Sequence, residues 1–305
     1  MTARRRREGK QAIAKSPLPL SISTQISRMN SFSLKGNKRQ PEPAGSTVSV
    51  IIATYNRPKQ LHRAIVSALG QTHPVLEILV CEDGRTNVCA DIVRSFDDPR
   101  IRHLPGSWTG MPAVPRNRGL LEAKGFWIGF LDDDDSWHPE KVKLQLQEAH
   151  RHNRGFIATA YTITQHNKKN RFSHHSFSEF LRGNPVALSS VLVQRHLITS
   201  GFSENPKLRG LEDFHLWLQV ATRNPCLRLE SLLIDYCDAS IDSVRRLHCP
   251  RTGAEELKAV LVAFLSQHPN QVHLPLRAVL ATRLRLVHIR MQGIVEQLLN
   301  QIWSR

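Results

Sequence analysis

Residues 126–135 read Phe-Trp-Ile-Gly-Phe-Leu-Asp-Asp-Asp-Asp. The short apolar run that opens this segment is typical of a strand buried on both faces, as in a parallel sheet. Four consecutive carboxylates follow it directly. Because like charges repel, such a group is costly to hold at a strand end without a nearby cation. The segment therefore predicts a buried strand that ends in an acidic turn.

Similar apolar runs recur on both sides of this segment and alternate with helical patterns. The expected strands are residues 48–53, 76–81, 101–104, 126–131, 156–163, 190–193 and 227–234. One helix is expected behind Asn56 and Pro58, which we interpret as its cap and first-turn residues. Others are expected behind Pro139 and over residues 212–222. This alternation predicts an α/β fold with a mostly parallel sheet flanked by helices.

Polar side chains follow three of the expected strands. Thr54-Tyr55-Asn56 follows the first, Glu82-Asp83-Gly84 the second, and residues 132–135 the fourth. The carboxyl ends of parallel strands meet at one edge of a sheet, where ligands bind. Oxygen ligands there select Mg²⁺ or Mn²⁺, which often also bind substrate phosphates. Taken alone, the acidic run fits a cation site or a solvated turn before the helix at Pro139 equally well.

Two further segments carry charged residues where ligands often bind. Residues 106–119 combine Gly and Pro with Arg116-Asn117-Arg118 ahead of an expected helix at Leu120. Cations and backbone donors in such a place can hold a diphosphate. Glu212 and Asp213 open another expected helix, where acids either cap the helix or act as a general base. Neither segment is specific by itself.

The net charge of +16 is concentrated at the two ends of the chain. Residues 1–40 carry ten Lys or Arg and one acid, and residues 245–305 carry nine and three, so the centre is almost neutral. A neutral centre disfavours a nucleic-acid-binding groove, and no nucleic-acid partner is expected. The basic ends favour contact with an anionic membrane surface or an acidic glycan.

Three regions follow from the composition of the chain. Residues 1–46 are predicted to be a disordered basic tail, and their Arg- and Ser-rich, acid-poor composition also matches a transit peptide. Residues 47–245 form the predicted α/β domain, and residues 246–305 a helical extension. In this extension an apolar stripe from Leu276 to Ile302 fits either a helix packed on the domain or a helix on a membrane surface.

The expected compartment follows from the cysteines and the apolar runs. The five cysteines include no C-x-x-C pair, so we expect reduced thiols. No apolar run approaches the roughly 20 residues of a membrane-spanning helix. We therefore expect a cytoplasmic protein, with peripheral contact at the inner membrane face through the basic ends.

In combination the motifs are more specific than each one alone. They occur in order as residues 48–58, 77–84, 117–120, 125–137 and 212–217. This combination resembles the family 2 glycosyltransferases of the GT-A fold, over about residues 47–240. Two positions depart from the usual family pattern: Glu82 replaces the first of two aspartates, and Ala53 stands where proline is common. The resemblance implies a nucleotide-sugar donor bound across the edge of the sheet.

The resemblance also implies a role for each matched residue. The implied donor-binding residues are Thr54, Tyr55, Asp83, Arg116, Asp132 and Asp133, with Asp83 recognising the base. Asp134, with Asp132, is the implied ligand of Mg²⁺ or Mn²⁺. Asp213 matches the catalytic base, and residues 184–193 resemble the stretch that lines the acceptor cleft.

These roles predict an inverting glycosyltransferase of cell-surface glycan or polysaccharide synthesis. It would move a sugar from a nucleotide-diphosphate donor, expected to be a UDP-sugar, to a hydroxyl of a glycan, lipid-linked or protein acceptor. Asp213 would take the hydroxyl proton during a single displacement, without a covalent intermediate. Two other classes stay open: a nucleic-acid-binding protein that uses its basic ends, and a catalytically silent binding protein on the same fold.

Overall fold

The computed structural model describes residues 45–84, 89–163, 177–181, 183–237 and 253–267. The predicted basic tail lies outside these residues except at its last two positions. The apolar stripe from Leu276 to Ile302 also lies outside them. Of the predicted helical extension, the structure describes helix α9 (Gly253–Gln267).

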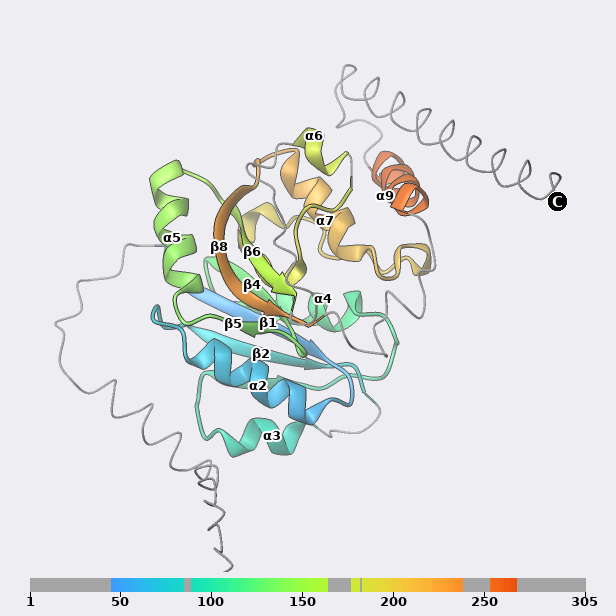
Figure 1. The fold of residues 1–305 in the computed structure, drawn as a ribbon. Coiled ribbons are helices and arrows are strands. Elements are labelled where there is room, and N and C mark those ends of the chain that lie inside the picture. Colours follow the sequence, from blue (N-terminus) through green and yellow to red (C-terminus); the bar gives the residue numbers. More distant parts are fainter. Residues whose placement is uncertain (1–44, 85–88, 164–176, 182, 238–252, 268–305) are drawn as a thin grey trace, which may run out of the picture. The chain divides into compact units, whose positions relative to one another are not determined.

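The first half of the described chain alternates strands with helices (Figure 1). Its elements are β1 (Val48–Thr54), α2 (Pro58–Leu69), β2 (Glu77–Glu82), α3 (Ala90–Ser95), β3 (Ile101–Leu104), α4 (Ala113–Glu122), β4 (Trp127–Asp132), β5 (Ser136–Trp137) and α5 (Lys141–His152). The later elements are β6 (Phe156–Ile163), α6 (Phe177–Phe180), β7 (Leu192–Gln194), α7 (Glu212–Ala221), β8 (Leu227–Tyr236) and α9, with short 3₁₀ turns at Leu188–Ser190, Arg195–Leu197 and Pro206–Leu208.

The strands form one sheet in the order β3-β2-β1-β4-β7-β6-β8-β5. Strands β3, β2, β1 and β4 are parallel, while β7 runs antiparallel to both β4 and β6. Strands β6 and β8 are again parallel, and β5 closes the sheet antiparallel to β8. The predicted α/β class is confirmed, with a parallel half that carries the three polar strand ends.

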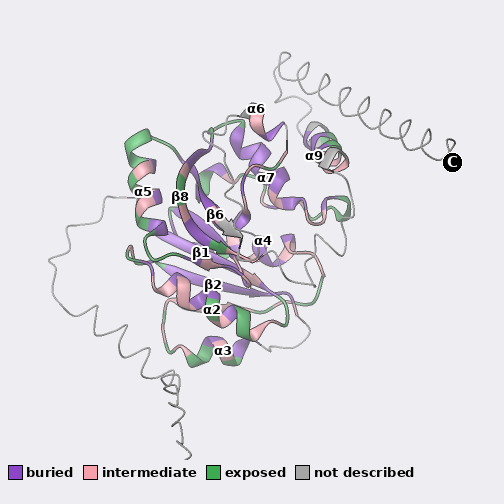
Figure 2. Ribbon diagram, viewed as in Figure 1, coloured by how far each residue is buried: buried purple, intermediate pink, exposed green. Residues whose placement is uncertain are grey.

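Alternate residues of the central strands enter two separate cores, because successive side chains of a strand point to opposite faces. On one face, Ile51 and Phe130 pack with residues of α4, α7 and α9. On the other, Val50 and Ile52 pack with residues of α2, α3 and α5. Figure 2 shows these strands as a buried layer between the helices. The parallel strands are therefore covered by helices on both faces.

Helix α7 joins the first core through large aromatic contacts. Trp217 is fully buried and stacks on Phe156 at 5.4 Å between ring centroids, and it meets Phe130 edge-on at 5.9 Å. Helix α9 covers α7 with its buried residues Leu257 and Phe264. This packing fixes the start of α7 against the sheet.

Most predicted elements are present, with two local corrections. The helix expected to begin near Leu120 begins at Ala113, so Arg116 lies within α4. The expected cap Asn56 has a left-handed φ of 52°, and Arg57 is the residue that precedes α2, without a side-chain cap bond. The chain therefore turns sharply at Asn56.

No helix in the described residues is both long and apolar enough to cross a membrane. The four cysteines that the structure describes are free thiols, and three of them are buried.

Candidate active site

The register of the parallel strands brings the polar strand ends together. Thr54 at the end of β1 pairs with Glu82 of β2, and its neighbour Ala53 pairs with Asp132 of β4. Helix α4 lies close beneath this edge, because a Cβ at Gly119 would come within 2.7 Å of the Ile51 side chain. The three polar segments predicted from the sequence thus share one edge of the sheet.

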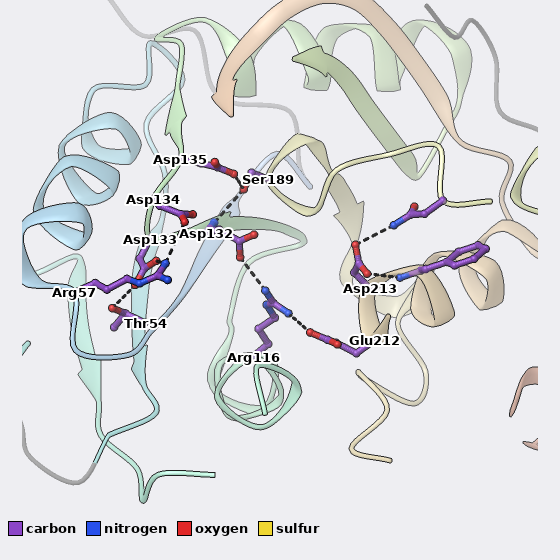
Figure 3. Close-up of polar contacts among 12 residues, drawn as sticks. Thr54, Arg57, Arg116, Asp132, Asp133, Asp134, Asp135, Ser189, Glu212 and Asp213 are labelled. Carbon is purple, nitrogen blue, oxygen red and sulfur yellow. Dashed lines mark hydrogen bonds and ion pairs between the residues drawn. The ribbon is translucent and has the colours of Figure 1, made fainter. Parts of the chain in front are cut away.

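Each carboxylate of the turn after β4 has a different set of partners (Figure 3). Asp133 accepts a hydrogen bond of 2.7 Å from Thr54 and pairs with Arg57 at 3.3 Å. Asp134 pairs with the same Arg57 nitrogen at 3.1 Å. Hydrogen bonds and ion pairs therefore join the acidic turn to the end of β1 and to the residue that precedes α2.

The fourth acid of the turn, Asp135, is held by neutral donors. The Ser189 hydroxyl donates to it at 2.5 Å, and the backbone N–H of Cys237 donates at 2.8 Å. The same serine oxygen accepts from the backbone N–H of Asp132 at 3.0 Å. Ser189 thereby links both ends of the acidic turn to the 3₁₀ segment before β7.

Burial disfavours the charged form of two of these acids. It raises the pKa of Asp133 to about 7, although the Thr54 hydroxyl and the Arg57 guanidinium act in the opposite direction. Burial likewise raises the pKa of Asp135 well above its usual value. Added positive charge at this edge would reverse both shifts.

Arg116 connects the acidic turn to helix α7. Its guanidinium donates to Asp132 and to Glu212, each at 2.8 Å, and the Glu212 side chain is almost fully buried. Burial alone would lower the pKa of Arg116, but Asp132 and Glu212 outweigh it and raise the pKa. Glu212 therefore acts as a partner of Arg116, and it forms no side-chain cap of α7.

Asp213 lies in the first turn of α7 and is partly exposed. Its Oδ2 accepts from the exposed Asn184 side chain at 3.0 Å, and its Oδ1 accepts from the backbone N–H of Phe214 at 2.7 Å. Asn184 belongs to the segment that precedes the 3₁₀ turn carrying Ser189. A partly exposed carboxylate that two donors orient is suited to accept a proton from a ligand.

The remaining candidates lie beyond the ends of β1 and β2. Asp83 accepts hydrogen bonds of 2.8 to 2.9 Å from the backbone and hydroxyl of Thr109 and from the backbone of Gly110. This fixes the loop that carries Trp108, whose ring lies 6.5 Å from that of Tyr55. The two aromatic side chains are 44% and 52% exposed. Asp83 thus anchors the loop that places Trp108 beside Tyr55 at the same edge.

The acidic turn suits a hard divalent cation that brings most of its own ligands. Mg²⁺ is usually bound by one or two carboxylates together with waters and substrate phosphates. No group of three or more His, Cys, Asp and Glu side chains that could hold a metal occurs among the described residues. Asp132 and Asp134 offer carboxylate oxygens of the kind that bind such a cation beside a phosphate-bearing ligand.

Two site residues, Arg57 and Trp108, receive no role from the sequence. Ser189 falls in the segment 184–193 that resembles the acceptor-cleft lining, and Glu212 is expected to cap its helix or act as a general base, so the contacts of both with the acidic turn and Arg116 are new. A basic residue directly after Thr-Tyr-Asn is a signal that could have identified Arg57. Trp108 and Ser189 lie in irregular segments, where periodicity gives no indication of side-chain direction.

The comparison with protein-family models matches residues 49–204, about half of the chain, to the model described as glycosyl transferase family 2. The chain belongs to glycosyl transferase family 2. The match includes β1, the acidic turn and the Asn184 segment, and ends before α7.

Curated relatives of this chain come from several bacteria. An uncharacterized glycosyltransferase of Rickettsia felis is 35% identical over 58% of this chain and 30% of its own length. A β-1,3-glucosyltransferase of Escherichia coli, named UDP-Glc:α-D-GlcNAc-diphosphoundecaprenol β-1,3-glucosyltransferase WfaP, is 28% identical over 70% of this chain and 82% of its own length. The chain thus spans less than a third of the Rickettsia relative.

Among solved structures, Staphylococcus aureus TarS 1-349 in complex with UDP-GlcNAc matches with a TM-score of 0.60. It is 16% identical and covers 73% of this chain and 67% of the TarS chain. At this identity the likeness shows the GT-A fold, which agrees with the fold expected from the sequence.

Proposed function

We propose that this chain is an inverting glycosyltransferase that moves a sugar from a UDP-sugar to a hydroxyl of a glycan or lipid-linked acceptor. The observation that carries the proposal is the pairing of Arg116 with both Asp132 and Glu212. It ties the acids after β4 to the helix start that bears Asp213. An acidic turn suited to a cation and a partly exposed carboxylate are therefore parts of one connected site.

The donor would lie along the edge formed by β1, β2 and β4. Tyr55 and Trp108 offer aromatic faces for the base, and Asp83 holds the loop that carries Trp108. Asp132 and Asp134 would hold Mg²⁺ or Mn²⁺, which supplies positive charge to the departing diphosphate. The Thr54 hydroxyl holds the Asp133 carboxylate in place through a hydrogen bond. WfaP is named for a UDP-Glc donor and TarS 1-349 was solved with UDP-GlcNAc, which supports a UDP-sugar here.

The acceptor would approach Asp213. As the acceptor oxygen attacks the anomeric carbon, the bond from that carbon to the diphosphate breaks and Asp213 takes the hydroxyl proton. Attack from the face opposite the leaving group inverts the anomeric configuration in one displacement. Hydrogen bonds from Asn184 and from the Phe214 N–H hold the Asp213 carboxylate in its orientation during this step.

The proposed acceptor class rests on the name of a relative, and the proposed location rests on the charge of the chain ends. WfaP acts on a diphosphoundecaprenol-linked acceptor by its name. A lipid-linked acceptor suits a cytoplasmic enzyme whose basic residues 1–40 and 245–305 contact an anionic membrane surface. Sedimentation with anionic liposomes, with and without residues 1–40 and 270–305, tests this contact, and equal sedimentation of both chains would reject it.

Product analysis tests the proposed reaction. The full chain is incubated with UDP-Glc or UDP-GlcNAc, Mn²⁺ and a GlcNAc-diphospholipid acceptor, and the anomeric configuration of the product is read by NMR. We expect a β-linked product from the α-linked donor. The variant Asp213→Asn should lose about 10² to 10⁴ in rate and keep donor binding. Unchanged turnover in this variant would exclude Asp213 as the base.

A further inference from the structure

Arg57 lies at the junction of β1 and α2, directly in front of the acidic turn (Figure 3). One of its terminal nitrogens is 3.1 Å from Asp134 Oδ2 and 3.3 Å from Asp133 Oδ1. The side chain is 21% exposed, while those of Asp133 and Asp134 are 7% and 16% exposed. A single guanidinium therefore balances two neighbouring carboxylates in a largely desolvated place.

This arrangement affects any cation that uses Asp134. An arginine stays protonated at every physiological pH. A divalent cation bound to Asp134 would lie close to the guanidinium, and two positive charges at contact distance repel each other. Metal binding to Asp134 therefore requires that Arg57 move away from this carboxylate. If both cations stay, their repulsion weakens metal binding.

We propose that Arg57 is an internal counter-ion of the acidic turn, which competes with the divalent cation for Asp134. This inference rests on the proposed metal site at Asp132 and Asp134. Without ligand, Arg57 stabilises the turn and keeps the affinity for free metal low. When a nucleotide diphosphate arrives with the metal, Arg57 leaves Asp134 and pairs with the incoming phosphate charge.

Arg57 thereby couples the two binding events. Metal alone has to displace the guanidinium and offers it no new partner. Metal together with a diphosphate displaces it and supplies an anion in the same place. The nucleotide should therefore strengthen metal binding more in the wild-type chain than in a chain that lacks the guanidinium.

A further arginine contact of the acidic turn does not involve the carboxylates for which Arg57 and the cation compete. Arg63, one turn into α2, donates to the backbone carbonyl of Asp134. This contact leaves the carboxylate oxygens untouched. It can hold the backbone of the turn while Arg57 changes partners.

Calorimetric titration of Mn²⁺ alone into the full-length chain tests the competition. The variants are Arg57→Gln and the charge control Lys59→Gln, whose exposed side chain lies two positions further along. We expect Arg57→Gln to bind Mn²⁺ about fivefold more tightly than wild type, a change in keeping with a partly exposed ion pair. Lys59→Gln should remain within twofold of wild type. UDP should strengthen Mn²⁺ binding less in Arg57→Gln than in wild type.

The outcomes separate this inference from the proposed metal site. Equal or weaker Mn²⁺ binding in Arg57→Gln, beside measurable binding in wild type, would overturn the role of Arg57 alone. Absence of Mn²⁺ binding in both chains, even with UDP, would overturn the metal site and the inference together. Circular dichroism verifies the fold of each variant. If Arg57→Gln does not fold, the apolar variant Arg57→Met replaces it in the same titration.

Discussion

Removing the guanidinium of Arg116 should weaken the fold as well as the site. Arg116 is 8% exposed and donates to Asp132 and Glu212 at 2.8 Å each. In the variant Arg116→Gln, Glu212 keeps a buried charge without its cation, and its Oε2 already lacks a hydrogen bond within the described residues. Breaking a buried ion pair from one side costs about 3–5 kcal/mol.

The lower end of that range applies, because the Asp132 side chain is 31% exposed and can be hydrated in the variant. A loss of about 3 kcal/mol corresponds to a fall in Tm of roughly 6–12 °C for a domain of about 200 residues. Urea denaturation and thermal unfolding followed by circular dichroism measure both quantities. The control Arg116→Lys keeps the charge and should lose less.

A double-mutant cycle isolates the ion pair. The variant Arg116→Gln with Glu212→Gln removes both charges, so its free energy of unfolding should recover at least half of the loss seen in Arg116→Gln. A wild-type midpoint in Arg116→Gln would refute the reasoning. A double variant as unstable as the sum of the two single variants would also refute it.

Three further predictions concern Asn184, Trp108 and Lys141. The variant Asn184→Ala should lower kcat about tenfold with little change in donor KM, since Asn184 orients Asp213, and a changed donor KM alone would contradict this role. The variant Trp108→Ala should weaken UDP binding about tenfold in calorimetry through lost base stacking, whereas truncation of the exposed Leu121 should not. Burial lowers the pKa of Lys141 in the folded chain well below 10.5, its value in the unfolded chain. Between the folded and the unfolded pKa, the unfolded chain binds more protons than the folded chain, so the free energy of unfolding rises with pH in that range. The variant Lys141→Met should flatten this rise in urea denaturation at pH values below 10.5, and an unchanged slope would contradict it.

The parallel half of the sheet could be predicted because its strands are buried on both faces. Strands covered in this way are continuous apolar runs, so the runs that contain Ile51, Leu79 and Phe130 stand out from their polar flanks. Parallel pairing then determines which ends share an edge. The meeting of Thr54 with the acidic turn follows from that topology and is present in the structure.

Other features depend on packing that a local pattern does not reveal. The segment before Arg116 contains Pro112 and Pro115 and precedes the helix expected at Leu120. Both prolines lie at the start of α4, where the first N–H groups have no partner within the helix, so proline is tolerated there. The two-residue strand β5 exists only through its pairing with β8.

The partners of the site residues were the least predictable part. Arg116 was expected to contact the donor, and the structure shows it between Asp132 and Glu212, which lie 80 positions apart in the sequence. Arg57 reaches residues 76 and 77 positions further along the chain. Such pairs depend on side-chain directions across the assembled sheet edge. The assigned roles of Asp134 and Asp213 remain predictions.

Titration of UDP into the full-length chain, with and without Mn²⁺ and beside Asp134→Asn, tests the central claim most directly. The account predicts UDP binding that Mn²⁺ strengthens at least tenfold in wild type and does not strengthen in Asp134→Asn. UDP binding of equal strength with and without Mn²⁺ in both chains would contradict a metal-assisted nucleotide site at the acidic turn.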